Sequence, residues 1–304
     1  MINKGIILIL TTALISGFSI FINKFIVTGL DPYLFTFLKN IIVAIFLFSI
    51  VLVFKEFKII KRLTKRDWLI LSLIGLFGGS VPFLLFFKGL TLTSAASGAF
   101  IHKTMFIFVA ILARVFLHEK ISNRLFIAAF LLILGNLLFL RLLPYKIQFG
   151  DLLILLATLF WAIENVISKY ALRTLTPRIV AFGRMGIGSI FILLFFAFTG
   201  DLSAVAGLTG IHWQWVVISA IILLGYVITW YTGLKYINVS KATMILLLGS
   251  PITLLLTFIF QGQIVSLKQL IGSMLIVAGL LVLMSFKNLK DILEDLPKFR
   301  YGRA

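Results

Sequence analysis

Ten long apolar runs separated by short polar gaps make up most of this chain. Each run reaches the roughly 20 mostly apolar residues that a helix needs to cross a bilayer. The whole sequence is 61% hydrophobic and 12% charged, whereas soluble domains are about half apolar and about a quarter charged. We therefore expect an all-α integral membrane protein with ten transmembrane helices. Their predicted limits are 5–27, 33–54, 68–90, 94–117, 122–141, 150–171, 178–199, 212–234, 240–261 and 266–286.

The net charge of +18 would suggest a nucleic-acid partner in a soluble protein. Here most Lys and Arg residues lie in the short gaps between apolar runs, as they do in cytoplasmic loops. The lipid bilayer, and not nucleic acid, is therefore the expected partner. The chain has no Cys, so disulfides and thiolate metal sites are excluded. The first run is too long for a signal peptide and lacks a small-residue cleavage site, so we interpret it as a membrane helix.

The distribution of positive charge also predicts the orientation. The segments between runs that lie on the same side of the membrane as the amino terminus hold roughly three times as many Lys and Arg residues as those on the opposite side. Such an excess is typical of the cytoplasmic face. We expect both termini in the cytoplasm. The expected location is a plasma membrane of the prokaryotic inner-membrane type.

The two halves of the chain resemble each other when aligned at two spacings that differ by one residue. Each half holds five apolar runs, an odd number, so the second half enters the membrane from the opposite side. Such inverted-topology repeats are typical of secondary transporters, an inference by analogy of fold. The predicted units are a first repeat at 1–142, a second repeat at 146–286 and a cytoplasmic tail at 287–304. The matched pairs are Gly5/Gly150, Lys24/Lys169, Pro32/Pro177, Phe37/Phe182 and Lys39/Arg184, and, at a spacing one residue shorter, Gly89/Gly233, Leu90/Leu234, Phe116/Phe260, Ser122/Ser266 and Gly135/Gly279.

Residues 89–140 and 233–284 resemble the two EamA-type repeats of the drug/metabolite transporter superfamily. The shared features in the first half are an Ala/Ser-rich helix start at Ser94–Ala99, a helix ending in Leu117-His118-Glu119, and the late glycine Gly135. The repeat openings also match, so the resemblance covers nearly the whole chain. It implies a ten-helix carrier that usually moves amino acids, related metabolites or drugs outward, over a wide range of substrates.

The second half departs from this pattern at two places. Gln261-Gly262-Gln263 stands where Leu-x-Glu is usual, and Pro251 has no counterpart in the first half. Gly249, Ser250 and Pro251 together predict a helix break inside the membrane. Such a break lines or shapes a substrate cavity in some transporters and is a static kink elsewhere.

Three ionisable residues fall well inside the predicted spans: Glu164, Lys103 and Arg184. A charge at the centre of a membrane helix costs at least about 2.5–3.5 kcal/mol and usually indicates function. On a helical projection Glu164 shares one face with small and polar residues, and Lys103 lies on a stripe of small residues. The lysines near span ends are expected to reach the interface instead; these are Lys24, Lys39, Lys88 and Lys169.

We hypothesise that Glu164 and Lys103 face a central cavity and influence each other's protonation. The carboxylate would then carry a coupling proton or hold a substrate amine. The alternative is structural: a buried ion pair, or a neutral Glu bonded to Ser and Asn, that fixes helix packing.

Other side chains are weaker candidates for the cavity wall, because in so apolar a chain an aromatic residue usually serves packing. His102 is a candidate proton relay or an ordinary hydrogen-bonded histidine. The remaining candidates are Ser19 and Asn23 on the first span, Trp161 and Asn165 on the sixth, and Tyr226, Trp230 and Tyr231 on the eighth.

The sequence argues against an enzyme. It contains no His-Glu-x-x-His zinc motif, no Gly-x-Ser-x-Gly elbow and no second membrane carboxylate to pair with Glu164. We expect no cofactor and no metal. Because no ATP-binding loop occurs either, we expect transport to be driven by a proton gradient or by the gradient of a small-molecule substrate, or to need a separate partner. A flippase or exporter of a lipid-linked or strongly apolar compound, a channel, and association as a homodimer all stay open.

Overall fold

A computed structural model describes residues 2–26, 31–93, 95–139, 147–199, 207–262 and 264–284. Within these ranges the regular structure is helical and no strand occurs. The first half contains α1 (Ile2–Ile26), α2 (Pro32–Val53), α3 (Phe57–Ile60), α4 (Lys65–Ile74), η1 (Gly75–Ser80), α5 (Val81–Leu90), α6 (Ala95–Lys103), α7 (Met105–Phe116) and α8 (Asn123–Phe139). The second half contains α9 (Phe149–Ala171), α10 (Pro177–Phe182), η2 (Gly183–Ile187), α11 (Gly188–Thr199), α12 (Gly210–Tyr236), α13 (Val239–Ile245), η4 (Leu246–Leu248), α14 (Gly249–Gln261) and α15 (Leu267–Leu283).

Every predicted apolar run is mostly helical over its described residues, but four of them are not a single continuous α-helix. The π-helical segments η1 and η2 interrupt two runs, the 3-10 segment η4 interrupts a third, and Thr104 separates α6 from α7. Eight helical stretches in the described ranges are long and apolar enough to span a membrane, while α8 and α15 are shorter apolar helices. The chain is thus a multi-pass helical protein, and the count of ten crossings stays a prediction.

Local sequence explains where several helices begin. The Asp31 side chain accepts a hydrogen bond from the Leu34 amide at 2.8 Å, and Pro32 occupies the first turn. At Thr176-Pro177 the same combination of a capping side chain and a proline starts α10. A capping oxygen satisfies an amide that would otherwise have no partner, and proline has no amide to satisfy.

Glycines allow two pairs of helices to cross closely. A Cβ atom on Gly233 of α12 would lie 3.1 Å from the Gly5 carbonyl oxygen of α1. A Cβ atom on Gly89 of α5 would lie 2.8 Å from the Gly150 carbonyl oxygen of α9. Small residues permit such backbone contact between membrane helices. Gly5 matches Gly150 and Gly89 matches Gly233 in the sequence, so equivalent glycines make equivalent crossings in the two halves.

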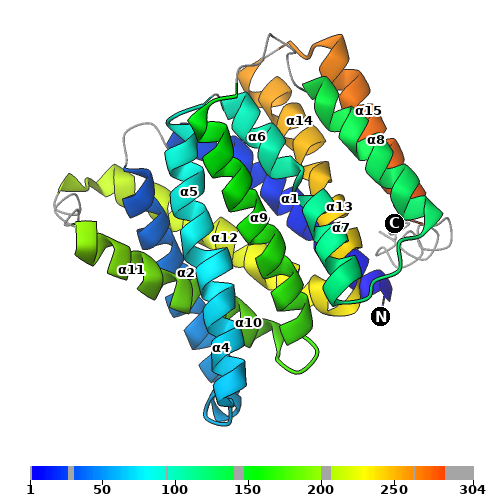
Figure 1. Ribbon diagram of the computed structural model, residues 1–304. Coiled ribbons are helices and arrows are strands. Elements are labelled where there is room, and N and C mark those ends of the chain that lie inside the picture. The colour runs from blue at the N-terminus through cyan, green and yellow to red at the C-terminus, as the bar shows by residue number, and fades with distance from the viewer. Residues whose placement is uncertain are drawn as a thin grey trace, which may run out of the picture.

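A second matched pair joins α8 to α15, which lie together at one side of the molecule (Figure 1). A Cβ atom on Gly135 would lie 2.7 Å from the Gly272 carbonyl oxygen, and one on Gly279 would lie 3.1 Å from the Ala128 carbonyl oxygen. The last helix of each half therefore packs on the other through a small-residue face.

Glu119, the last residue of the Leu117-His118-Glu119 sequence, connects the first half to the start of α13 in the second half. Glu119 accepts hydrogen bonds from the amides of Val239, at 2.8 Å, and Ser240, at 3.2 Å, and from the Ser240 hydroxyl at 2.7 Å. These groups open α13, where a carboxylate satisfies free amides and suits the positive end of the helix. Gln263, at the matching place in the second half, lies outside the described residues.

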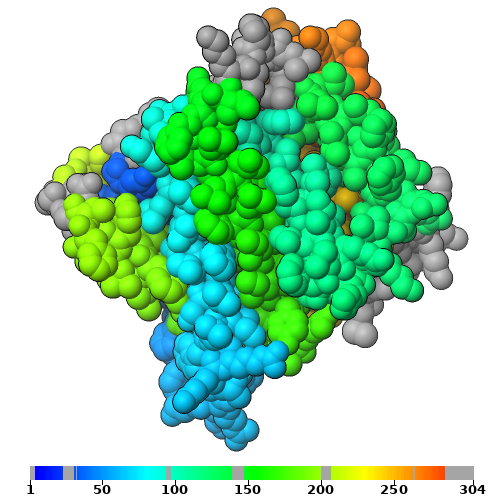
Figure 2. Space-filling view, in the orientation of Figure 1, coloured from blue at the N-terminus to red at the C-terminus, as the bar shows by residue number. Residues whose placement is uncertain are grey.

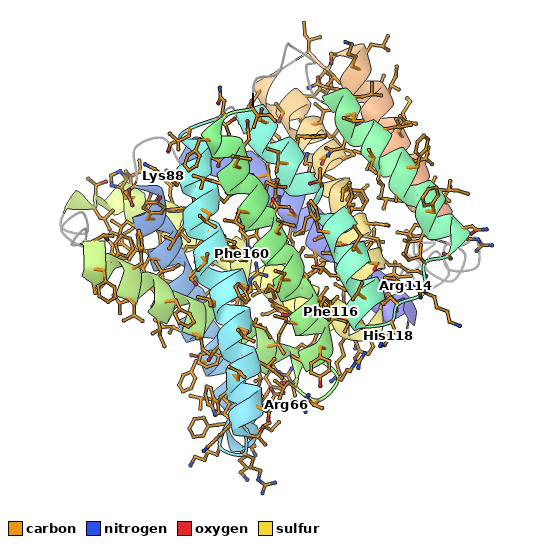
Figure 3. The ribbon with its side chains drawn as sticks, viewed as in Figure 1. Arg66, Lys88, Arg114, Phe116, His118 and Phe160 are labelled. Carbon is orange, nitrogen blue, oxygen red and sulfur yellow. The ribbon has the colours of Figure 1, made fainter. Side chains whose placement is uncertain are left out.

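The surface of the molecule is apolar over most of its helices. Figure 2 shows the face formed by α4, α5, α9 and α6–α8, and large side chains such as Phe126, at 70% exposure, and Phe198, at 89%, point outward. An apolar surface of this extent fits contact with lipid. Charged side chains lie near helix ends: Arg66 is in the first turn of α4 and Arg114 in the last turn of α7 (Figure 3).

Candidate functional site

Two π-helical segments meet inside the molecule. Segment η1 lies in the third predicted span and η2 in the seventh, and the two are in contact. A Cβ atom on Gly188, the residue after η2, would lie 2.7 Å from the Gly79 Cα atom. π-Helical turns are rare and are frequent at functional sites. This junction is therefore where we describe the candidate site.

The wide turn of η1 presents two carbonyl groups to side chains from other helices. The Gly78 carbonyl accepts hydrogen bonds from Trp161 Nε1 at 3.2 Å and from Arg184 Nε at 3.3 Å. The Gly79 carbonyl accepts one from Asn40 Nδ2 at 3.2 Å. A Cβ atom on Gly78 would overlap the Glu164 side chain. Glycine is thus required here because α9 approaches the bare backbone.

Glu164 lies at the centre of a buried polar cluster and is 0% exposed. Its Oε1 accepts hydrogen bonds from Ser168 Oγ at 2.5 Å and from the Tyr231 hydroxyl at 2.7 Å. Its Oε2 lies 3.6 Å from Arg184 Nη1, and the same nitrogen donates to the Tyr231 oxygen at 3.3 Å. We call Glu164, Ser168, Arg184 and Tyr231 the Glu164 cluster.

The two oxygens of this carboxylate are not equivalent. Oε1 has two hydroxyl donors, whereas Oε2 is buried and makes no hydrogen bond within the described residues. A buried polar atom without a partner is uncommon and marks a place where a proton, water or ligand binds. The cluster can therefore bind a proton or a polar ligand at Oε2 beside the guanidinium.

Arg184, not Lys103, is the cation that the structure places at ion-pair distance from Glu164. The sequence alone favoured Lys103 because both side chains faced inward on their own helices. Lys103 is the last residue of α6, is half-buried, and precedes the helix break at Thr104. Coupling between Glu164 and Lys103 stays a prediction, now with Arg184 as the nearer charge.

Aromatic rings gather beside the Glu164 cluster. The Trp161 ring lies 4.9 Å from His102, 5.3 Å from Phe83 and 5.5 Å from Phe86, measured between centroids. Phe86 and His102 are themselves 5.5 Å apart. We call these four residues the Trp161 cluster. The Gly78 carbonyl joins it to the Glu164 cluster, because Trp161 and Arg184 both donate to that oxygen.

Asn165 and Trp230 each keep a buried polar atom without a hydrogen-bond partner in the described part of the chain. Asn165 Nδ2 donates to the Trp161 carbonyl at 2.8 Å and lies 3.7 Å from the Met105 sulfur. The Trp230 ring stacks on Tyr226 at 6.3 Å. Asn165 of α9 and Trp230 of α12 are thus neighbours of the Glu164 and Trp161 clusters in the chain.

The two remaining candidates, Ser19 and Asn23, belong to α1. Ser19 is half-buried on α1. The side chain of Asn23 lies outside the part of the chain whose side chains the structure describes.

The helix break predicted at Gly249, Ser250 and Pro251 lies just after a 3-10 segment, and these three residues form the first turn of α14. The chain runs as a 3-10 helix over Leu246–Leu248 before α14 begins at Gly249. Thr253 then donates to the Gly17 carbonyl of α1 at 2.9 Å. The break at Thr104 in the first half lies at nearly the matching position and contains no proline, so proline is not what sets this feature.

Two of the lysines near span ends contact protein instead of lying free at the interface. Lys169 Nζ donates to the carbonyls of Leu234 and Ile237, both at 2.7 Å, and so caps the end of α12. Lys39 is 7% exposed. Lys88, by contrast, is exposed at the opposite end of the molecule from Arg66 (Figure 3).

The sequence reasoning missed the glycine-rich segments that build the site. Residues 75–80 read GLFGGS and residues 183–188 read GRMGIG. Three glycines within six residues of an apolar run are a detectable signal of close backbone contact. Tyr231 was expected only as an aromatic residue of the cavity wall, whereas its hydroxyl donates a hydrogen bond to the Glu164 carboxylate.

A multi-pass helical protein with glycine-mediated helix crossings and a buried charged cluster has the features of a membrane transport protein. Two matches to one family model, over residues 3–141 and 148–285, place this chain in the EamA-like transporter family.

Named relatives agree with this assignment, and a solved structure shares the fold. The uncharacterized transporter YyaM of Bacillus subtilis is 28% identical over 76% of this chain and 78% of its own length. The riboflavin transporter ImpX of Fusobacterium nucleatum is 28% identical over 77% of this chain and 82% of its own length. A solved structure titled "Crystal structure of protein" has a TM-score of 0.75 and 18% identity, and the match covers 92% of this chain and 96% of that one. At this identity the structure shows the fold alone.

Proposed function

We propose that this chain is a secondary-active carrier that exports amino acids or related small metabolites by alternating access between two inverted five-helix repeats. Both termini would lie in the cytoplasm. The observation that carries the proposal is the Glu164 cluster, a carboxylate, a guanidinium and two hydroxyls held in a membrane interior at the junction of η1 and η2. Buried charges are costly in a membrane and are kept where ions or substrates pass.

The helix crossings support the alternating-access part of the proposal. The Gly5–Gly233 crossing and the Gly89–Gly150 crossing are equivalent in the predicted repeat. An inverted repeat would place them toward opposite faces of the membrane, where each can serve as the closed gate of one state.

A proton is the coupling ion that the cluster favours. Glu164 Oε2 accepts no hydrogen bond within the described residues and lies at ion-pair distance from Arg184, so protonation of this oxygen would weaken the ion pair. A protonated Glu164 would leave the guanidinium free to hold the substrate, so that proton and substrate binding are linked.

Reconstituted protein tests the proposal directly. Purified carrier in liposomes should exchange a radiolabelled amino acid, or a compound found by thermal-shift screening, against an internal pool of the same compound. An imposed pH gradient should drive net movement, and E164Q should keep exchange but lose the dependence on the gradient. Full gradient-driven transport by E164Q would refute the coupling role, and no exchange of any screened metabolite would refute the carrier.

The screen should include planar heterocycles. One relative is named a riboflavin transporter, and the rings of the Trp161 cluster offer edges and faces to a flat molecule. Saturable riboflavin exchange would assign the substrate to that class.

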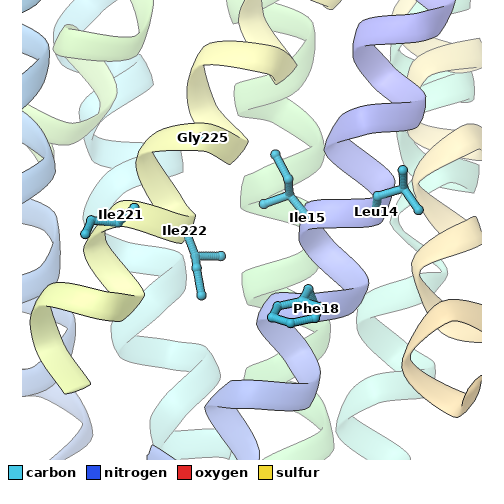
Figure 4. A pocket seen from close by; sticks show the side chains of 6 residues that line it. All are labelled: Leu14, Ile15, Phe18, Ile221, Ile222 and Gly225. Atoms are coloured by element: carbon cyan, nitrogen blue, oxygen red, sulfur yellow. The ribbon is translucent and has the colours of Figure 1, made fainter. Parts of the chain in front are cut away.

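A second function, export of a lipid-linked or strongly apolar compound, is favoured by one observation. A groove of about 400 Å³ opens between α1 and α12 and is lined by apolar residues (Figure 4); these are Leu14, Ile15, Phe18, Ile221, Ile222 and Gly225. Such a groove suits entry from the bilayer. Widening or blocking it, with I222A or G225L, should change transport of an apolar compound and leave exchange of a polar metabolite unaffected.

A further inference from the structure

Lys39 is a buried cation with no counter-charge among the described residues. It lies on α2, about 10 Å from the start of the helix, and is 7% exposed. Its Nζ lies 5.1 Å from the ring centroid of Phe35 and 5.7 Å from that of Phe83. Within the described ranges no Asp or Glu oxygen lies within 4.0 Å of this nitrogen. Ring faces attract a cation but do not replace a carboxylate.

Two neighbours of Lys39 on α2 have buried polar atoms that lack partners. Thr36 Oγ1 and Asn40 Oδ1 make no hydrogen bond within the described residues. The amide nitrogen of Asn40 is held by the Gly79 carbonyl at 3.2 Å, so its oxygen is fixed in direction. Thr36, Lys39 and Asn40 thus place two donors and an acceptor near one another on α2, and buried groups of this kind normally have partners.

The matching position in the other half shows how a buried cation is otherwise neutralised. Lys39 matches Arg184, and Arg184 pairs with Glu164. Glu164 itself matches Ser19, which carries no charge. The first half therefore has the cation without the acid. An isolated buried ammonium is unfavourable in a membrane interior, so an anion from outside the chain is the natural partner.

We propose that Lys39, Thr36 and Asn40 form the subsite for the carboxylate end of the transported substrate. The Lys39 ammonium and the Thr36 hydroxyl donate to the carboxylate, while Asn40 Oδ1 accepts from an adjacent amino or hydroxyl group. Phe83 contacts both Lys39 and Trp161, so the body of the substrate lies against the Trp161 cluster. This inference rests on the proposed carrier function and names the substrate class, an organic carboxylate.

Matched probes that differ only in charge test the subsite without any mutation. Binding of L-phenylalanine and L-phenylalaninamide, and of benzoate and benzamide, is measured by thermal shift and by calorimetry on the purified full chain. The carboxylates should bind at least about tenfold more tightly than the amides, as expected for loss of one charge-assisted hydrogen bond. Equal binding of acid and amide overturns the proposal.

Variants then locate the effect. K39Q should lose about tenfold or more in carboxylate affinity, K39R should restore most of it, and K88Q, at an exposed lysine of α5, should bind like wild type. Monodisperse elution of each variant separates a binding defect from misfolding. Unchanged carboxylate binding in K39Q overturns the subsite.

Failure of this inference is distinguishable from failure of the carrier. If wild type binds no carboxylate but exchanges a neutral compound, the Lys39 subsite is wrong and the carrier function stands. If the acids bind in a Lys39-dependent way but nothing is exchanged, the subsite stands and the carrier function falls.

Discussion

Arg184 and Lys39 occupy matching positions of the predicted repeat, yet their surroundings differ. Arg184 lies beside a carboxylate, a tyrosine hydroxyl and a backbone carbonyl. Lys39 lies against two phenylalanine rings, and its neighbours on α2 have unpartnered polar atoms. The chain thus neutralises one buried cation internally and leaves the other to a ligand. A repeated scaffold can in this way hold two different electrostatic sites.

The largest expected effect comes from removing the cation that is already paired. R184M leaves the Glu164 carboxylate buried without its counter-charge, which typically costs about 3–5 kcal/mol of unfolding free energy. The thermal unfolding midpoint of the purified protein should fall accordingly. The double variant R184M/E164Q should recover much of the loss, since no charge remains, and a midpoint equal to wild type in R184M would mean that the pair is not buried as described.

Removing the tyrosine hydroxyl should have the next largest effect. Y231F deletes a donor to Glu164 and an acceptor for Arg184, and hydrogen bonds to charged groups are worth about 1.5–3 kcal/mol. Y226F is the matched control, because the Tyr226 hydroxyl has no hydrogen bond within the described residues. Equal unfolding midpoints for the two variants would contradict the bridging role of Tyr231.

A side chain added at Gly79 of η1 should perturb the surroundings of Arg184 and those of Lys39 together. In G79A the new methyl group would overlap the Arg184 carbonyl oxygen, while the carbonyl of the same residue holds Asn40. Overpacking of this kind costs about 1–3 kcal/mol. The control is G225A, whose Cβ would meet only Ile15 Cδ1 at 3.5 Å. A G79A variant as stable as G225A would show that η1 and η2 do not pack this closely.

The smallest loss of stability is expected at the other cation. K39M replaces an ammonium that has no acidic partner in the described part of the chain with an apolar side chain among phenylalanine rings, so the unfolding midpoint without ligand should stay level or rise. The unfolding midpoint should therefore fall in R184M and not fall in K39M, which tests directly whether the two cations differ in their partners. A fall in midpoint as large as that of R184M would reveal an internal counter-charge for Lys39 and remove the reason for a ligand there.

Much of the helical framework could be predicted from the sequence. The run predicted at 33–54 is α2 at Pro32–Val53, and the run predicted at 150–171 is α9 at Phe149–Ala171. The length of an apolar run, a Pro near a helix start and a capping Asp or Thr are local properties. They can be recognised in the sequence without knowing which helices pack together. The π-helical turns at η1 and η2 were not predicted, because their winding depends on what packs against them.

The candidate site could be predicted only in part. Glu164 was singled out because a carboxylate in an apolar run is costly wherever the helix packs, and Trp161 and Asn165 followed from its helical face. The choice between Lys103 and Arg184 could not be made, since it depends on which helix adjoins α9. Lys39 was expected at the interface by its distance from the span end, and its burial depends on Phe83 of a different span.

By itself the sequence determined that this chain crosses a membrane repeatedly, where its long apolar runs lie and which residues start several helices, and that a carboxylate lies within the apolar region. These follow from transfer free energies and helix-end chemistry, which act over a few residues. Only the tertiary structure decided that Arg184 and Tyr231 hold that carboxylate and that Lys39 has no acid beside it among the described residues. Pairing between charges depends on distances of a few ångströms across helices, and such distances are set by how glycines let the backbones approach.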